Sequence, residues 1–269
     1  KFSLLDYLGL SSRRTPSDHV EIFNWIVVAP DNTVTIRIAQ MEMGQGTITS
    51  MTQLLAEELE VDWSKIRTEF ISIATHLDRD KVYGRTCTES SEGVSRSHLP
   101  LRIAGAQIRT MLIEAAAHRL DAQVAELVAE NSLVIHKPTG RKLTYGELAA
   151  DAAKMSVPDP SSIKLKDPKD WNYIGKSLPR IDIPKMINGT AVFGTDIKLP
   201  GMKHAAIAMC PVFGGRLKYH EPGMALSKTG VRKVVEIKHK QNGDAIAVIA
   251  DDWWQASIAL DSMPIEWDG

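Results

Sequence analysis

Hydrophobic residues recur along the first part of the chain with two periods, and these periods predict its secondary structure. Residues 33–39 alternate between polar and hydrophobic side chains, as in a strand, and a turn at 30–32 joins them to residues 25–29 in a predicted hairpin. Hydrophobic residues at helical spacing predict helices over 47–60 and 94–119. Weaker patterns predict strands at 67–73 and 133–136 and helices at 122–129 and 145–153.

The last part of the chain is richer in strand patterns. Strands are predicted around Phe193 and over 204–209, 216–220, 231–237, 245–250 and 265–267, and Asp251 is predicted to cap a helix through residue 259. The two patterns together indicate an α+β fold. We predict an N-terminal arm at 1–23, a first domain at 24–155, a proline-containing, charged linker at 156–174 and a second domain at 175–269.

Composition and charge exclude several classes of protein. The 32 Lys and Arg residues nearly balance the 33 Asp and Glu residues, and this balance argues against nucleic acid as a main partner. No stretch approaches the roughly 18 consecutive apolar residues that a membrane span needs. Cys87 and Cys210 are far apart in the sequence, so we predict no disulfide framework. A cluster of four cysteines is absent, so we predict no iron–sulfur cluster held by this chain.

The first candidate for ligand binding is Gly44-Gln45-Gly46-Thr47, between a predicted strand and a predicted helix. Glycines allow a backbone with positive φ to come close to a ligand, and N–H groups at a helix start favour an anion. Gln45 adds an amide that can both donate and accept. From these residues alone, an anion-binding loop and a tight turn capped by Thr47 are equally good interpretations. The Lys of a Walker A loop and the GxGxxG spacing of a dinucleotide fold are both missing.

The second candidate is a hydroxyl-rich segment before the long predicted helix, which contains Thr88, Ser90, Ser91, Gly93 and Ser95. Hydroxyls and backbone amides at a helix start suit phosphate or ribose oxygens. A single capping residue would account for one hydroxyl, but not for several in succession. Two such loops in one domain favour a long ligand with several negative charges, such as a dinucleotide.

Longer motifs carry a family resemblance. Glu42-Met-Gly-Gln-Gly46, followed by Leu55-Ala-Glu-Glu-Leu-Glu-Val-Asp-Trp63, resembles the molybdenum-binding subunit of the xanthine dehydrogenase and aldehyde oxidase family, and in particular the branch typified by the β subunit of isoquinoline 1-oxidoreductase. Further matches follow in the expected order, and they comprise Leu101-Arg-Ile-Ala-Gly-Ala106, Leu143-Thr-Tyr-Gly-Glu-Leu148, Ile174-Gly-Lys-Ser-Leu-Pro-Arg180, Phe193-Gly-Thr-Asp-Ile197, Leu199-Pro-Gly-Met202, Pro211-Val-Phe-Gly-Gly215 and Ile265-Glu-Trp-Asp268.

The resemblance implies an architecture. Residues 24–155 would form part of a molybdopterin-binding domain, and residues 175–269 an α/β hammerhead-like domain. In the xanthine dehydrogenases themselves the segment like residues 175–180 comes first and the Met-Gly-Gln-Gly segment comes late. The order in this chain is the reverse, as in a circular permutation.

The resemblance also implies a cofactor, which is molybdopterin with molybdenum and, in many bacterial members, its cytosine dinucleotide form. By position in the motif, Gly44, Gln45, Gly46 and Thr47 would contact the pterin–phosphate region. The segment from Thr88 to Ser95 would match the second loop of the family, with contacts from Thr88, Ser90, Ser91, Gly93 and Ser95. Relatives often have Thr-Gly-Gly-Ser-Arg-Ser there, whereas this chain carries Glu89 and Glu92, which would repel a phosphate unless they point away.

The implied activity is that of a molybdenum hydroxylase, which oxidises an aldehyde or an N-heteroaromatic compound with oxygen derived from water. The glutamate base of the family lies in a Gly-Glu motif near the end of the full subunit. No glutamate here matches that motif, so we assign no catalytic and no metal-binding residue and expect this chain to hold an incomplete active site. The competing interpretations are a non-catalytic binding or assembly protein that retains the fold and a generic nucleotide-binding domain.

The resemblance also indicates partners and a location. The remainder of the molybdenum subunit would complete the active site, and an iron–sulfur subunit with [2Fe–2S] clusters would take the electrons. A cytochrome c subunit is a further candidate partner. Near relatives are often exported or membrane-associated, which favours a periplasmic or membrane-associated location over a cytoplasmic one.

Overall fold

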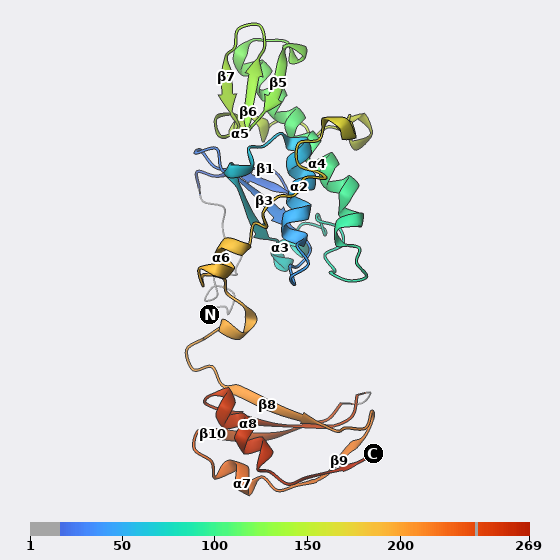
Figure 1. Cartoon of the computed structure of the whole chain (residues 1–269), viewed down its shortest axis with the longest axis vertical. Coiled ribbons are helices and arrows are strands. Elements are labelled where there is room, and N and C mark those ends of the chain that lie inside the picture. Colours follow the sequence, from blue (N-terminus) through green and yellow to red (C-terminus); the bar gives the residue numbers. More distant parts are fainter. Residues whose placement is uncertain (1–16, 240–241) are drawn as a thin grey trace. The chain divides into compact units, whose positions relative to one another are not determined.

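The protein consists of two compact units, one that ends at Ala191 and one that spans Val192–Gly269 (Figure 1). The structure, a computed structural model, describes residues 17–239 and 242–269. Of the predicted arm at 1–23, residues 1–16 lie outside this range. The division at 191/192 comes later than the predicted domain boundary at 174/175, because the intervening segment is bound to the first unit.

The sheet of the first unit has the strand order β1-β2-β3-β4. It comprises β1 (Val20–Phe23), β2 (Ile26–Val28), β3 (Val34–Ile38) and β4 (Ile66–Phe70). The predicted hairpin is confirmed, since β2 and β3 pair antiparallel with Ile26 opposite Ile36. The prediction of an irregular arm up to residue 23 is wrong at its end, because β1 adds to the edge of this hairpin. The fourth strand runs parallel to β3.

Helices α2 (Thr47–Leu59) and α4 (Gly93–Leu120) pack against each other in the first unit (Figure 1). Both predicted helices are confirmed, and Met51, Leu55 and Ile108 lie in their shared core. A Cβ at Gly105 would lie 2.5 Å from the carbonyl oxygen of Leu55, so the close approach of the two helices requires glycine there. The predicted strand at 67–73 ends at Phe70, and Ile73–Asp78 forms the short helix α3.

A second sheet in this unit corrects one prediction. The strands β5 (Leu127–Glu130), β6 (Leu133–His136) and β7 (Lys142–Thr144) form an antiparallel sheet. The helix predicted at 122–129 is wrong, because only Val124–Glu126 forms a single 3₁₀ turn and the next residues pair with β6. Ladder hydrogen bonds thus override the local helix preference of this stretch. Helix α5 (Tyr145–Ala152) is confirmed, with Thr144 and Glu147 forming a capping box.

The predicted linker is an ordered part of the first unit. It contains the 3₁₀ turns η3 (Pro160–Ser162) and η4 (Pro168–Asp170), and α6 (Ile183–Ile187) follows further along. The fully buried carboxylate of Glu57 accepts the N–H groups of Asn172, Tyr173 and Ile174 at 2.7–3.0 Å and the ammonium of Lys166 at 2.5 Å. Buried charge needs such partners, and these bonds fasten the segment to α2.

The second unit is a small α+β structure. The strands β8 (His204–Met209), β10 (Val231–Ile237) and β11 (Ala245–Ala250) form one sheet, β9 (Arg216–His220) pairs with β12 (Ile265–Asp268), and α7 (Gly223–Leu226) and α8 (Trp253–Asp261) complete the unit. All but one of the predicted strands are confirmed. The strand predicted around Phe193 is wrong, because that residue precedes the 3₁₀ turn η5 (Gly194–Asp196). The cap of α8 is Asp252 rather than Asp251.

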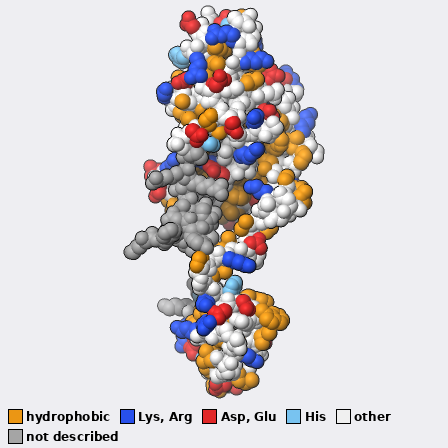
Figure 2. Space-filling view, turned by 90° about the vertical axis from the view of Figure 1, so that its left-hand side faces the viewer, with side chains coloured by type: hydrophobic (Ala, Val, Ile, Leu, Met, Phe, Trp, Pro, Cys, Tyr) orange, Lys and Arg blue, Asp and Glu red, His pale blue; other side chains and the backbone are white. Residues whose placement is uncertain are grey.

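The strands and helices of both units agree with the predicted α+β class. The hammerhead-like identity of the second unit stays a prediction. Hydrophobic side chains gather along one side of the second unit on the face seen in Figure 2, and charged ones lie mainly toward the opposite side. In the described part of the chain, no helix is both long and apolar enough to span a bilayer.

Candidate functional site

The two predicted ligand loops lie side by side in the first unit, each at the start of a helix. The first loop, residues 41–47, leads into α2, and the second loop, residues 86–95, leads into α4. The hydroxyl of Thr88 accepts the backbone N–H of Met41 at 2.8 Å, and the Gln40 amide donates to the carbonyl of Arg85 at 2.9 Å. A Cβ at Gly93 would lie 3.7 Å from a methyl carbon of Thr47. The fold therefore brings together residues that are 45 to 47 positions apart in the sequence.

The backbone of the first loop depends on its glycines. Gly44 and Gly46 have φ of +101° and +81°, a region that side chains with a Cβ rarely adopt. No atom lies within 4 Å of the Cβ position at either glycine, so this side of the loop is open. The side chain of Gln45 folds onto its own loop, where it accepts the N–H of Met43 at 2.5 Å and donates to the carbonyl of Met41 at 2.9 Å.

Glu42 is a residue of this loop whose role the sequence did not reveal. Its carboxylate accepts the N–H groups of Gly44, Gly46 and Ile48 at 2.8, 2.9 and 3.0 Å. Part of the N–H set that was expected to be free for an anion is therefore already occupied. The alternative, a turn capped by Thr47, is not observed. The N-cap residue of α2 is Gly46, which has no side chain that could cap the helix. The available signal was an acid two residues before the first glycine.

The second loop leaves its helix start open. Ser90 and Ser91 make a left-handed turn with φ of +53° and +56°, and Ser95 donates its hydroxyl to the carbonyl of Glu92 at 3.3 Å. Glu92 is the N-cap residue of α4, and its side chain caps no N–H group. Among the described residues, nothing accepts the N–H groups of residues 93–95. Free N–H groups at the start of a long helix are suited to an anion.

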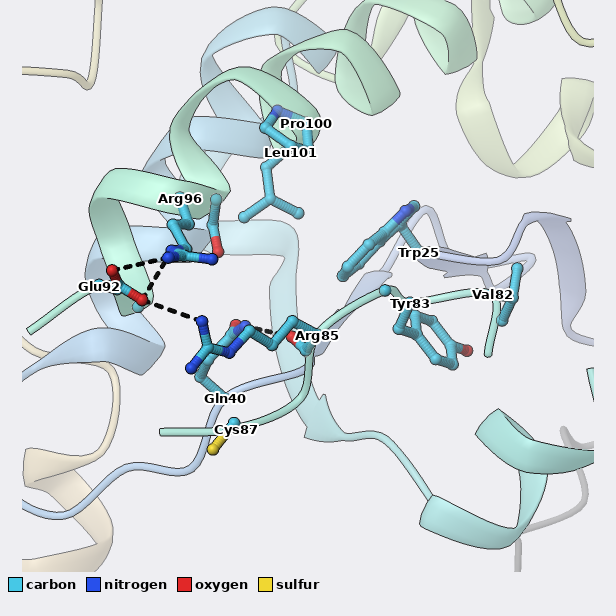
Figure 3. Close-up of a pocket in the computed structure, with 13 residues that line it drawn as sticks. Trp25, Gln40, Val82, Tyr83, Arg85, Cys87, Glu92, Arg96, Pro100 and Leu101 are labelled. Atoms are coloured by element: carbon cyan, nitrogen blue, oxygen red, sulfur yellow. Dashed lines mark hydrogen bonds and ion pairs between the residues drawn. The ribbon is translucent and has the colours of Figure 1, made fainter. Parts of the chain in front are cut away.

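The two acids of the second loop are paired with arginines, and Figure 3 shows the pairs that Glu92 forms with Arg85 and Arg96. Arg85 forms ion pairs with Glu89 and, at 3.1 Å, with Glu92, and Arg96 pairs with Glu92 at 2.6 Å. Desolvation alone would lower the pKa of Arg85, but the hydrogen bond with Glu89 outweighs it and raises that pKa above its ordinary value. The repulsion that these acids would exert on a phosphate is therefore offset by neighbouring positive charge.

A pocket of about 340 Å³ opens beside the second loop (Figure 3). Its apolar wall includes Trp25, Tyr83 and Leu101, and its polar wall includes Gln40 and Arg96. The amide oxygen of Gln40 is buried and has no hydrogen-bond partner among the described residues. A ligand group that carries an N–H or O–H would satisfy this acceptor. The sequence did not indicate the pocket, because its lining comes from several separate segments.

These features fit an elongated anionic cofactor. One open helix start, a neighbouring glycine loop with an open face and a pocket lie within one region of the first unit. The described residues contain no group of three or more His, Cys, Asp or Glu that would hold a metal ion. The free N–H groups and the open glycine turn of these loops are suited to the phosphate and organic parts of a ligand. The ligand contacts expected from Gly44, Gln45, Gly46 and Thr47 stay predictions, and so do those expected from the second loop.

Comparison with known proteins points the same way. The chain is 29% identical to the β subunit of isoquinoline 1-oxidoreductase from Brevundimonas diminuta, over 96% of this chain and 37% of that protein. It is 28% identical to a membrane-bound aldehyde dehydrogenase [pyrroloquinoline-quinone] of Gluconacetobacter polyoxogenes, over 90% of this chain and 31% of the relative. It is 27% identical to a nicotinate dehydrogenase subunit of Pseudomonas putida, over 92% of this chain and 20% of that protein. The chain thus spans well under half the length of these relatives.

Among solved structures, quinoline 2-oxidoreductase from Pseudomonas putida 86 matches at a TM-score of 0.36 and 20% identity, over 50% of this chain and 17% of that one. A likeness of that size does not establish a shared fold. The match to a family model is more extensive, since residues 9–178 match the molybdopterin cofactor-binding domain. Because this match covers more than half of the chain, the protein belongs to the molybdopterin cofactor-binding domain family, and its resemblance to the molybdenum-binding subunits of the xanthine dehydrogenase and aldehyde oxidase family is confirmed.

Proposed function

We propose that the first unit holds the pterin–phosphate portion of a molybdenum cofactor in a molybdopterin-dependent oxidoreductase. The observation that carries this proposal is the contact between its two loops, through the Met41 N–H and the Thr88 hydroxyl at 2.8 Å, which places the starts of α2 and α4 together. Helix starts and glycine turns are preformed sites for phosphate groups. When bound, the cofactor supplies the redox chemistry of molybdenum, and this chain's residues hold it in place.

The finer proposal concerns the reaction and the partners. The relatives are named for isoquinoline, aldehyde and nicotinate oxidation, which supports an aldehyde or N-heteroaromatic substrate. We propose the cytosine dinucleotide form of the cofactor, oxygen derived from water, and electron transfer through [2Fe–2S] clusters of an iron–sulfur subunit. The catalytic base and the substrate pocket are assigned to the remainder of a molybdenum subunit. A cytochrome c subunit and a periplasmic or membrane-associated location belong to the same proposal.

The first test is chemical analysis of the purified assembly. Molybdenum by elemental assay and pterin by fluorescence after oxidation are both expected in stoichiometric amounts. If the intact assembly contains neither, the proposal fails and a non-catalytic protein that retains the fold is the better interpretation.

The second test targets the first loop. Gly44→Val and Gly46→Val are expected to reduce pterin content, because a branched Cβ is strained at the positive φ of both positions and blocks the open face. Gly140→Val is the matched control, since Gly140 also has a positive φ, +69°, and open surroundings but lies in the turn before β7. A loss of pterin in all three variants alike would show that backbone strain, not the loop, is responsible.

A further inference from the structure

Glu42 behaves as a built-in anion at the start of α2. Its side chain is only 9% exposed, and both carboxylate oxygens accept backbone N–H groups, those of Gly44 and Gly46 on one oxygen and that of Ile48 on the other. Ile48 lies in the first turn of α2 and Gly46 is its N-cap residue, so the carboxylate is at the positive end of the helix dipole, which attracts negative charge. Glu42 therefore takes the position in which a bound phosphate oxygen would otherwise satisfy the same groups.

Arg180 holds this carboxylate in place from a distant segment. Its guanidinium donates to the carbonyl of Gly44 at 2.9 Å and lies 3.5 Å from the Glu42 carboxylate. Asp182 fixes the guanidinium with hydrogen bonds of 3.0 and 2.6 Å. The adjacent N–H of Ile181 donates to the hydroxyl of Thr49 at 3.0 Å, so the segment is attached both to the first loop and to α2.

At the start of α4, unlike the start of α2, no carboxylate of the described residues accepts the backbone N–H groups. The N–H groups of Gly93, Val94 and Ser95 have no acceptor among the described residues, and Glu92 turns its carboxylate to Arg85 and Arg96 instead. The two helix starts are neighbours, since a Cβ at Gly93 would touch Thr47. One of the two is closed by an internal carboxylate, and the other is open.

We infer that Glu42, held by Arg180, is a positioning residue that closes the α2 start and directs the anionic group of the cofactor to the α4 start. This inference rests on the proposed function. Because Glu42 fixes the backbone on both sides of Gln45, it also sets the direction in which that part of the loop faces the ligand. Arg180 acts through Glu42 and the Gly44 carbonyl and does not itself serve as the phosphate ligand.

The experiment is residue-resolved hydrogen–deuterium exchange on the intact assembly after removal of its cofactor, with inorganic phosphate as the probe. In the wild-type protein, phosphate is expected to slow exchange at Gly93, Val94 and Ser95 and to leave Gly44, Gly46 and Ile48 unchanged. In Glu42→Ala, exchange at these last three amides is expected to rise about ten-fold or more without phosphate. Phosphate added to this variant is then expected to slow exchange at the Gly44, Gly46 and Ile48 amides as well.

Two further variants separate positioning from general destabilisation. Acetate should restore slow exchange at the first loop in Glu42→Ala, because it supplies the missing carboxylate. Arg180→Met should raise exchange there by a smaller factor, and this factor should be smaller still when the change is added to Glu42→Ala, where only the bond to the Gly44 carbonyl remains to be lost. Glu130→Gln, at the exposed end of β5, is the charge-matched control and should match the wild type.

The outcomes decide the inference separately from the proposed function. Phosphate that protects the Gly44–Ile48 amides in the wild-type protein overturns it, and so does an absence of protection at Gly93–Ser95. Unaltered exchange in Glu42→Ala overturns it too. Pterin absent from the untreated assembly overturns the proposed function, whereas the exchange of the Glu42 variants still reports on the loop itself.

Discussion

The hydroxyl of Thr88 accepts the backbone N–H of Met41 at 2.8 Å, so a side chain of the second loop satisfies the backbone of the first. A second hydrogen bond joins the two segments, in which the Gln40 side-chain amide, just before the first loop, donates to the carbonyl of Arg85, just before the second. Two turns that are separate in the sequence therefore form one surface. These hydrogen bonds add to the packing of α2 against α4 in fixing the relative position of the two loops, which are largely exposed.

Replacing Thr88 tests this link. Thr88→Val keeps the shape of the side chain but removes the acceptor, and the free energy of unfolding should fall by about 1 kcal/mol. Because the two loops would then be held together less tightly, cofactor should dissociate several-fold faster. Urea titration and timed pterin release measure the two effects. Thr88→Ser keeps the acceptor and should behave as the wild type, so an equal loss in both variants would contradict the role of the hydrogen bond.

Local patterns in the sequence predicted most elements of the first unit. The alternation at 33–39 and the helical spacing at 47–60 depend only on which face of each element is buried, and such periods are visible without a structure. The glycine and hydroxyl segments were recognisable for the same reason, since helix starts need particular residues. That they meet in space could only be predicted from the family resemblance.

Long-range contacts explain what the sequence did not show. Residues 127–130 form a strand because β6 lies beside them, not because of their own preference. The segment at 166–174 is polar and contains proline, as a linker would, but its backbone N–H groups find the buried carboxylate of Glu57. The role of Glu42 was missed similarly, because an acid on the surface and an acid that caps a neighbouring turn look the same in a sequence.

Gly105 provides a test of the packing between α2 and α4. Gly105→Ala places a methyl group 2.5 Å from the Leu55 carbonyl oxygen, which is backbone and cannot move aside cheaply. Overpacking of this kind should lower the free energy of unfolding by about 1–3 kcal/mol, even though alanine favours helix. Gly194→Ala is the control, because nothing lies within 4 Å of its Cβ position, and it should change stability little. Chemical denaturation followed by circular dichroism measures both variants.

Glu57 should contribute far more to stability than its neighbour Glu60. Both acids lie on or next to the end of α2, and both pair with Lys166, at 2.5 and 2.8 Å. Only Glu57 is fully buried and also accepts the N–H groups of residues 172–174. Glu57→Gln should therefore cost about 3–5 kcal/mol and expose the 163–176 segment to proteases, whereas Glu60→Gln should cost about 1 kcal/mol or less. Similar losses in the two variants would show that the lysine contact alone matters.

The contact of Glu57 with Lys166 and residues 172–174 also predicts how attachment of the 163–176 segment to α2 depends on pH. Burial alone would raise the pKa of Glu57, but Lys166 and the N–H groups of residues 172–174 outweigh it and leave the pKa below its ordinary value of 4.5. The contribution of Glu57 to stability is therefore complete above pH 4.5 and is lost as the pH falls through the lower folded-state pKa. Burial would lower the pKa of Lys166, yet Glu57 and Glu60 raise it above 10.5, so its contribution is complete below pH 10.5 and is lost as the pH rises further.

Detachment of the segment should accordingly be rarest on a plateau between about pH 4.5 and 10.5. Hydrogen–deuterium exchange of the segment at each pH, across this range and beyond both of its ends, and corrected for the intrinsic pH dependence of exchange, measures the fraction of molecules in which the segment has detached. In Glu57→Gln the acid side of the plateau should flatten relative to the wild type, because no carboxylate remains there to be protonated. An unchanged acid limb in that variant would assign the pH dependence to other acids, such as Asp182, whose pKa is lowered by its hydrogen bond with Arg180.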